Sequence, residues 1–271
     1  MSPTLAPAVS ANDHERMSSL AHVAGADAGT ASAAHAAGAE VGACADAAAS
    51  ARAAAEAAPR LIVMDIDSTL INEEVIDLLG EEAGVGEEVA AITERAMRGE
   101  LDFREALNAR VGLLAGLDAS VFERTFARVT FTPGALELVA EARRLGWKVG
   151  VVSGGFHEVA DRIVEAAGID YCLANRLEVA EGLLTGRLAS EVVTKEAKLA
   201  ALTRWAEELG IPLERTVAIG DGANDIPMIC AAGTGIAFCA KPKTRAAAPF
   251  ALDERDLMQA FAIIDAQETS A

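Results

Sequence analysis

The chain of 271 residues carries a formal net charge of −18, and 52% of its residues are hydrophobic against 24% charged. The hydrophobic share predicts a mostly globular protein with a sizeable core. The negative charge excludes a general binder of nucleic acids or acidic membranes, because its field repels polyanions. A small anionic substrate remains compatible with this charge if a local group of cations receives it.

Residues 1–58 differ in composition from the rest of the chain. Roughly half of them are Ala or Gly, few are large and apolar, and no hydrophobic period is sustained. Stretches such as ADAAASARAAAEAA favour helix but hold no large side chains to bury. We therefore predict a flexible extension here rather than a small regulatory domain.

Strands and helices alternate from Arg60 onward. RLIVMDI is predicted as a strand, residues 73–128 contain only helical patterns, and FTPGALELVAEARRLG is a helix with Pro near its start and Gly at its end. RLEVAEGLLTGRL is predicted as a hairpin that turns at Glu181-Gly182. The other strands are KVGVVSGG, DYCLAN, TVAIGDG and TGIAFCA, the other helices are HEVADRIVEAAG, KEAKLAALTRWAEELG and DIPMICAAG, and a short βα segment closes the chain.

Strands that are apolar throughout and separated by helices predict a parallel sheet covered on both faces. The expected fold class is therefore α/β, with a doubly wound, mostly parallel sheet. The all-helical stretch interrupts the alternation, and we interpret it as an inserted cap. The predicted catalytic core is then residues 59–72 and 129–271, and the predicted helical cap is residues 73–128.

The cysteines and the amino terminus indicate where the protein works. Cys44, Cys172, Cys230 and Cys239 form no CxxC pair and lie far apart or in apolar company, so we expect free buried thiols in a reducing compartment. No apolar run reaches the length of a membrane span, about 18 residues or more. The amino terminus lacks the basic start and apolar core of a secretory signal, so a cytoplasmic location is expected.

Three polar clusters follow predicted strands: DIDST at Asp65 and Asp67, SGG at Ser153, and GDGAND around Asp221. In a doubly wound sheet, ligands bind at the carboxyl ends of the strands, so we expect the three clusters to meet in one crevice. Such convergence is stronger support for a site than any one cluster alone.

Asp65 and Asp67 are two residues apart, so in extended backbone they point the same way. One carboxylate could then attack a reacting centre while the other moves protons at the same centre. The plain alternative is a strand-to-helix turn with Asp caps.

Asp221 and Asp225 supply oxygen ligands of the kind that Mg²⁺ takes beside a substrate phosphate, although Asp225 could instead orient its neighbours. The alternative is a Gly-rich turn with Asp and Asn caps. Ser153, with two glycines after it, could hold phosphate oxygens, or it could simply form a turn of small residues. Composition does not choose between Lys198 and Lys195 as a phosphate partner. His157 is interpreted as a polar residue at a helix start rather than as a base.

DIDST, VVSGGF, the Lys of KEAK and GDGANDIPM resemble, in order and spacing, the four motifs of the haloacid-dehalogenase-like phosphohydrolases. Within that superfamily the chain is similar to the phosphoserine phosphatase family, through DSTLINEEVIDLL, AMRGELDFREALNARVGLL, ANRLEV and AFCAKP as well. The resemblance covers nearly everything from about residue 60 to 258.

The resemblance implies that Asp65 is the nucleophile that forms an aspartyl phosphate, and that Asp67 is the acid and base. It implies a Mg²⁺ ion between Asp65, Asp221 and the backbone carbonyl of Asp67. The phosphoryl oxygens would contact Ser153, the backbone of Gly154, Lys198 and Asn224. It also selects Lys198 over Lys195.

The resemblance further implies that Glu74 pairs with the ammonium group of an amino-acid substrate and that Arg110 holds its carboxylate. Both residue types are also common on helix surfaces, and Glu73 could exchange roles with Glu74. Met97 and Phe103 are expected to wall the pocket, although core packing would explain them equally well.

The implied reaction is Mg²⁺-dependent hydrolysis of O-phospho-L-serine to serine and phosphate, the last step of serine biosynthesis. One alternative is a phosphatase or phosphotransferase of the same superfamily that acts on phosphothreonine, phosphohomoserine or phosphocholine. A remote alternative is a non-catalytic binding module, which the presence of both Asp65 and Asp67 disfavours. The Ala-rich extension departs from the regulatory domain that longer relatives carry, so serine feedback is not expected.

Overall fold

A computed structural model of the chain describes residue 58 and residues 60–270, so the predicted extension lies outside the described residues except for its last position. The core is a six-stranded sheet with the order β3-β2-β1-β6-β7-β8, and every neighbouring pair is parallel. Its strands are β1 (Leu61–Met64), β2 (Lys148–Phe156), β3 (Tyr171–Asn175), β6 (Thr216–Gly220), β7 (Thr234–Phe238) and β8 (Phe250–Leu252).

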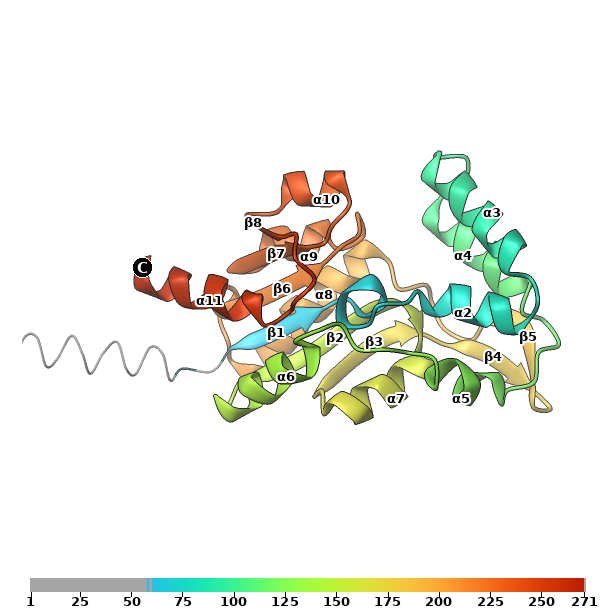
Figure 1. Cartoon of the computed structure of the whole chain (residues 1–271), viewed down its shortest axis with the longest axis horizontal. Helices are drawn as coiled ribbons and strands as arrows, with labels where there is room; N and C mark the ends of the chain where they lie inside the picture. Colours follow the sequence, from blue (N-terminus) through green and yellow to red (C-terminus); the bar gives the residue numbers. More distant parts are fainter. Residues whose placement is uncertain (1–57, 59, 271) are drawn as a thin grey trace, which may run out of the picture. The chain divides into compact units, whose positions relative to one another are not determined.

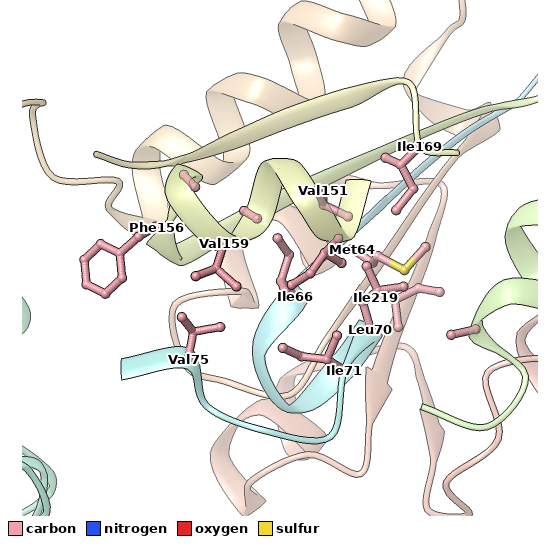
Figure 2. Close-up of a cluster of buried hydrophobic side chains, with 14 of the residues drawn as sticks. Met64, Ile66, Leu70, Ile71, Val75, Val151, Phe156, Val159, Ile169 and Ile219 are labelled. Atoms are coloured by element: carbon pink, nitrogen blue, oxygen red, sulfur yellow. The ribbon is translucent and has the colours of Figure 1, made fainter. Parts of the chain in front are cut away.

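Both faces of this sheet are covered, as the uniformly apolar strands predict. Along β1, Ile62 and Met64 pack into one hydrophobic cluster while Leu61 and Val63 pack into the other. The first cluster contains side chains of α6 (Ala135–Arg144), α7 (His157–Ala167) and α11 (Gln259–Ser270), and the second contains side chains of α8 (Lys195–Leu209) and α9 (Ile226–Ala231). Figure 2 shows part of the first cluster, where Met64 of β1, Val151 of β2 and Val159 of α7 lie close together.

The chain order of the strands places a crevice at the middle of the sheet. The chain runs from β1 outward through β2 to β3, and then returns to the other side of β1 for β6, β7 and β8. At such a switch point the loops after the two central strands diverge to opposite faces. The loops after β1 and β6 therefore frame the crevice, and these are the loops with the predicted aspartates.

A group of helices extends from the carboxyl end of β1 and is drawn at the right of Figure 1. A wide turn, η1 (Ile66–Leu70), leads into α2 (Val75–Glu82), α3 (Gly86–Met97), α4 (Phe103–Gly112) and α5 (Val121–Phe126). Helix α4 begins with a capping box, in which Asp102 accepts from the backbone of Glu105 and Glu105 accepts from the backbone of Asp102. These are the helices that the sequence predicts; the bounds of the cap as a domain stay a prediction.

The predicted hairpin forms β4 (Leu177–Ala180) and β5 (Leu183–Leu188), which pair antiparallel. Its turn residues Glu181 and Gly182 both have positive φ, at 53° and 81°, as a tight two-residue turn requires. The hairpin hydrogen-bonds to residues of the helical group: Leu184 N donates to Leu117 O at 2.8 Å, and Gly116 N donates to Leu184 O at 2.7 Å. A segment that follows β3 in the chain is thus joined to helices that follow β1.

The short elements η2 (Leu213–Arg215) and α10 (Pro242–Ala247) complete the described chain. Within residues 58 and 60–270, none of the helices combines the length and the hydrophobicity needed to span a bilayer. Cys172, Cys230 and Cys239 are free, as expected, but they are not buried: Cys230 is exposed and the other two are half-buried. The prediction of buried thiols was wrong, because these apolar neighbourhoods lie at the rim of the core. Cys44 lies outside the described residues.

Candidate active site

Asp65 follows β1 directly and ends the strand at the crevice. Its backbone N–H donates to Ile219 O of β6 at 3.0 Å, which extends the sheet by one residue. Its Oδ1 accepts from the N–H of Ile66 at 2.7 Å and so caps the turn η1. Within that turn Ser68 has a φ of 57°, which bends the chain sharply away from the sheet. The carboxylate is therefore fixed at its base and buried.

Asp67 is held from both the cap side and the core side. Its Oδ1 accepts from Val75 N at the start of α2 at 2.8 Å, and its Oδ2 accepts from Ser153 Oγ of β2 at 2.8 Å. Ser153 Oγ in turn accepts from Gly155 N at 2.7 Å. A Cβ atom at Gly155 would lie 2.9 Å from Asp67 Oδ2, so only glycine leaves room for this carboxylate. Burial raises the pKa of Asp67, and its hydrogen bonds partly offset that rise.

Lys198 of α8 is fully buried, and its Nζ lies 2.8 Å from Asp65 Oδ2 and 2.7 Å from Asp225 Oδ1. Burial alone would lower the pKa of Lys198, but the two carboxylates raise it above its usual value. Asp225 also accepts from Gly222 N at 2.9 Å. Lys198 is thus a permanent cation against the oxygen of Asp65, and Asp225 holds it there. Lys195, the alternative, is exposed and faces Glu196 at 3.8 Å.

Three buried carboxylates meet at this point. One oxygen each of Asp65, Asp221 and Asp225 lie within 4.8 Å of one another. Burial raises the pKa of Asp65, as does the charge of Asp225, and burial likewise raises the pKa of Asp221. One buried ammonium does not neutralise three carboxylates. Oxygen donors in this number suit a hard divalent cation, so the residues fit the metal that the motifs imply.

A cavity of about 310 Å³ lies over this cluster, between the strand ends and helices α2, α3 and α4. Its lining includes Asp65, Asp67, Glu74, Arg110, Gly154, Asp221 and Asn224, which are seven of the nine predicted site residues. The other two, Ser153 and Lys198, are buried and contact Asp67 and Asp65 from below.

Glu74 and Arg110 both face the cavity from the cap side. Glu74 Oε1 accepts from Ser68 Oγ at 2.8 Å. Burial and the charge of Asp67 raise the pKa of Glu74 to about 7. Arg110 is half-buried; its Nε donates to Ala106 O at 3.3 Å, and burial lowers its pKa. The cavity is therefore lined by an acidic and a basic group in addition to the aspartates at its base.

Glu73, which the sequence left as an alternative, does not line the cavity. Its carboxylate instead accepts from Thr130 N at 2.9 Å and from the Thr130 hydroxyl at 2.5 Å. Phe103 lines the cavity beside Gly154, whereas Met97 is 76% exposed and lines a neighbouring cleft.

His157 belongs to a second group of candidate ligands, with Asp161 and Cys172. Its Nε2 accepts from Ala174 N at 3.2 Å, and its Nδ1 lies 2.7 Å from Asp161 Oδ1. A metal-bound imidazole donates its second ring N–H, and here that nitrogen is an acceptor. We therefore interpret the group as a structural contact between α7 and β3.

Comparison with known proteins identifies the family to which this chain belongs. The haloacid dehalogenase-like hydrolase family matches residues 62–229. The phosphoserine phosphatase of Streptococcus thermophilus is 62% identical over 205 residues, which cover 76% of this chain and 95% of that protein. The chain belongs to the haloacid dehalogenase-like hydrolases, in the phosphoserine phosphatase branch.

Other members of the branch support this assignment. The phosphoserine phosphatase of Methanocaldococcus jannaschii is 48% identical over 200 residues, which cover 74% of this chain and 95% of that protein. A solved structure described as a phospho-aspartyl intermediate analogue of phosphoserine phosphatase aligns with a TM-score of 0.72 and 46% identity, over 76% of this chain and 98% of that one. A substrate-bound phosphoserine phosphatase complex aligns with the same score, identity and coverage.

Sequence reasoning missed several residues that line or support the site of this hydrolase. Lys241 lines the cavity, with its Nζ 3.6 Å from Asp221 Oδ2, and Asp77 lines it from α2. Asn175 is buried and joins two loops: its Nδ2 donates to Gly154 O at 2.8 Å, and its Oδ1 accepts from Val193 N at 2.8 Å. AFCAKP and ANRLEV contain Lys241 and Asn175, so the signal was present although no role was assigned.

Proposed function

We propose that this phosphatase hydrolyses O-phospho-L-serine to L-serine and phosphate, the reaction that ends serine biosynthesis, with Asp65 as nucleophile and Mg²⁺ as cofactor. One observation carries the proposal: a single cavity holds the paired aspartates and the carboxylate cluster at its base and Glu74 with Arg110 on its cap side. A phosphorylated amino acid needs these three partners, for its phosphate, its ammonium and its carboxylate.

The first half of the reaction transfers the phosphoryl group to the protein. An oxygen of Asp65 attacks phosphorus, the bond from phosphorus to the serine oxygen breaks, and Asp67 gives its proton to that oxygen. Burial raises the pKa of Asp67, which favours the protonated carboxyl that this step needs. Lys198 stays against Oδ2 of Asp65 and orients the carboxylate.

The second half restores the nucleophile. Asp67, now ionised, takes a proton from water, the water oxygen attacks phosphorus, and the bond to Asp65 breaks to release phosphate. When bound, Mg²⁺ would be held by Asp65, Asp221 and the Asp67 carbonyl, and it would offset the negative charge of nucleophile and phosphate.

The remaining proposed contacts are to the phosphoryl oxygens. The backbone of Gly154 and the side chain of Asn224 line the cavity and would donate to them. The Ser153 hydroxyl donates to Asp67 in this structure, so its proton must turn toward the phosphate when substrate binds.

The test is phosphate release with Mg²⁺ from phosphoserine, phosphothreonine, phosphohomoserine, phosphocholine and a chromogenic aryl phosphate. We expect a clear preference for phosphoserine that a chelator abolishes, and no turnover by Asp65→Asn with an unchanged circular dichroism spectrum. Turnover of the aryl ester without the preference would retain the roles of Asp65 and Asp67 but reject those of Glu74 and Arg110. Substantial activity in Asp65→Asn would reject nucleophilic catalysis.

A further inference from the structure

A second and wider cleft, of about 630 Å³, adjoins the active-site cavity. One wall comes from α3 and α4, and the other from the start of α8 and the segment that leads into α10. The two hollows share six lining residues: Thr93, Phe103, Arg110, Gly222, Asn224 and Lys241. The wide cleft is therefore continuous with the cavity and forms an approach to it from solvent.

The approach cleft is rich in cations. Five of its lining residues are basic and two are acidic: Arg104, Arg110, Lys195, Lys241 and Lys243 against Asp102 and Glu196. Asp102 is already bonded to the backbone N–H of Glu105 at 2.8 Å, and Glu196 lies 3.8 Å from Lys195. Among the residues that the structure describes, neither Arg104 nor Lys243 has an ion-pair partner. The local formal charge is thus 5 − 2 = +3.

This concentration of positive charge contrasts with the formal net charge of the whole chain, which is −18. The whole sequence contains only five lysines. Lys198 contacts Asp65, and three others line the approach cleft. The fifth, Lys148, is the first residue of β2, at the amino end of the strand, and its Nζ lies 2.5 Å from Asp170 Oδ1.

The cavity beneath the cleft has the opposite sign. Its lining contains five acidic residues, Asp65, Asp67, Glu74, Asp77 and Asp221, against Arg110 and Lys241. The net negative charge of the chain repels a phosphomonoester dianion at long range, and the cations of the cleft oppose that repulsion locally. Cations of one sign that line a cleft focus the field and can raise the association rate by about 10 to 10³-fold.

We propose that Arg104, Lys195 and Lys243 form an electrostatic funnel that draws phosphomonoester dianions into the cleft and toward the cavity. These three side chains are exposed and lie outside the catalytic contacts. They therefore change the rate at which substrate associates rather than the rate of the chemical step. The inference rests on the proposed function only in requiring a dianionic phosphate ester as substrate.

The experiment compares Lys195→Gln/Lys243→Gln and Lys195→Glu/Lys243→Glu with the unaltered enzyme, with Mg²⁺ present, from low to high ionic strength. We expect kcat to stay constant while kcat/KM for phosphoserine falls about threefold to tenfold in the Gln pair at low salt, and further in the Glu pair. The differences should vanish near 1 M salt, where the screening length is about 3 Å.

The matched control is Lys148→Gln/Arg187→Gln, which removes two exposed cations away from the cleft. It should leave kcat/KM within about twofold at every salt concentration. Inhibition by L-serine, which has no net charge, should be equal in all variants. A loss of kcat/KM that persists at 1 M salt, an equal loss in the control, or no loss in the Glu pair would overturn the funnel.

The same series with the aryl phosphate separates the two proposals. If phosphoserine is not preferred but the aryl phosphate shows the charge and salt dependence, the funnel stands and the substrate assignment fails. If phosphoserine is preferred but its kcat/KM does not depend on these charges, the substrate assignment stands and the funnel fails.

Discussion

Arg110 lines the cavity from α4, and its hydrogen bonds to other groups of the protein are long. Its Nε donates to a backbone carbonyl of its own helix at 3.3 Å, and one terminal nitrogen lies 3.5 Å from Thr93 Oγ1. Much of its donor capacity is therefore available to a carboxylate in the cavity.

Arg110→Ala should raise KM for phosphoserine about a hundredfold, because the substrate carboxylate would lose its half-buried cationic partner. KM for the aryl phosphate, which has no carboxylate, should change little. Steady-state kinetics on the two substrates measures the difference. An equal rise in KM for both would show that Arg110 does not bind the substrate carboxylate.

Glu74 does not stabilise the fold when it is ionised. Its pKa is raised from 4.5 to about 7 by burial and by the charge of Asp67, so its ionised form is unfavourable in the folded protein. The folded state binds more protons than the unfolded state between these two values, so stability falls as pH rises from about 4.5 to about 7 and stays lower above that.

Glu74→Gln should therefore stabilise the metal-free protein at pH 8 by about 3 kcal/mol and leave it nearly unchanged at pH 4.5. Urea unfolding in the presence of chelator at the two pH values measures this. A variant that is less stable than the parent at pH 8 would contradict the assignment.

Single residues also mark the limit of prediction from sequence. Asp65, Ser153 and Asp221 could be placed together because apolar runs identify parallel strands, and parallel strands end at one edge of the sheet. Whether Lys195 or Lys198 faces the aspartates depends on the rotation of α8 against the sheet. Glu73 is held away from the cavity by Thr130, which is 57 residues further along the chain, whereas Glu74 accepts from Ser68 and lines the cavity. Such choices depend on long-range contacts, and pattern alone does not make them.

At the scale of elements, the hairpin β4–β5 shows the same limit. Its strands and its turn follow from local sequence, because alternating side chains flank Glu181-Gly182. Its hydrogen bonds to residues 116–119 join segments about 65 residues apart and depend on how the helices after β1 are placed.

The turn also gives a test of the hairpin itself. Glu181 is exposed and has a φ of 53°, a conformation that Asn tolerates better than Glu. Glu181→Asn should stabilise the protein by about 1 kcal/mol without changing kcat. Thermal unfolding measures the change in stability, and Glu191→Asn, at an exposed position outside the hairpin, is the control. A lower melting temperature in Glu181→Asn would contradict the turn geometry.

For the whole molecule, the carboxylate cluster would couple folding to the binding of a cation. Asp65 and Asp225 share the buried ammonium of Lys198, and Asp221 faces the exposed Lys241, so three buried carboxylates are incompletely balanced in the folded protein. A cation that binds only the folded state stabilises it by mass action.

We expect Mg²⁺ at a hundred times its dissociation constant to stabilise the protein by about 2.7 kcal/mol. Asp221→Asn should bind Mg²⁺ more weakly and should itself raise the stability of the metal-free protein, since it removes one buried charge. Thermal unfolding with and without Mg²⁺ measures both effects. An equal shift by Mg²⁺ in the parent and in Asp221→Asn would place the ion elsewhere.

The helices after β1 and the hairpin after β3 are connected to the sheet at two separate places. At the first, Ile71 bridges Phe131; at the second, Ala189 N donates to Arg176 O at 2.7 Å. Two separate links restrain this group of helices and the hairpin more firmly against the sheet than a single link would. They therefore help to keep Glu74 and Arg110 on the wall of the cavity that Asp65 also lines.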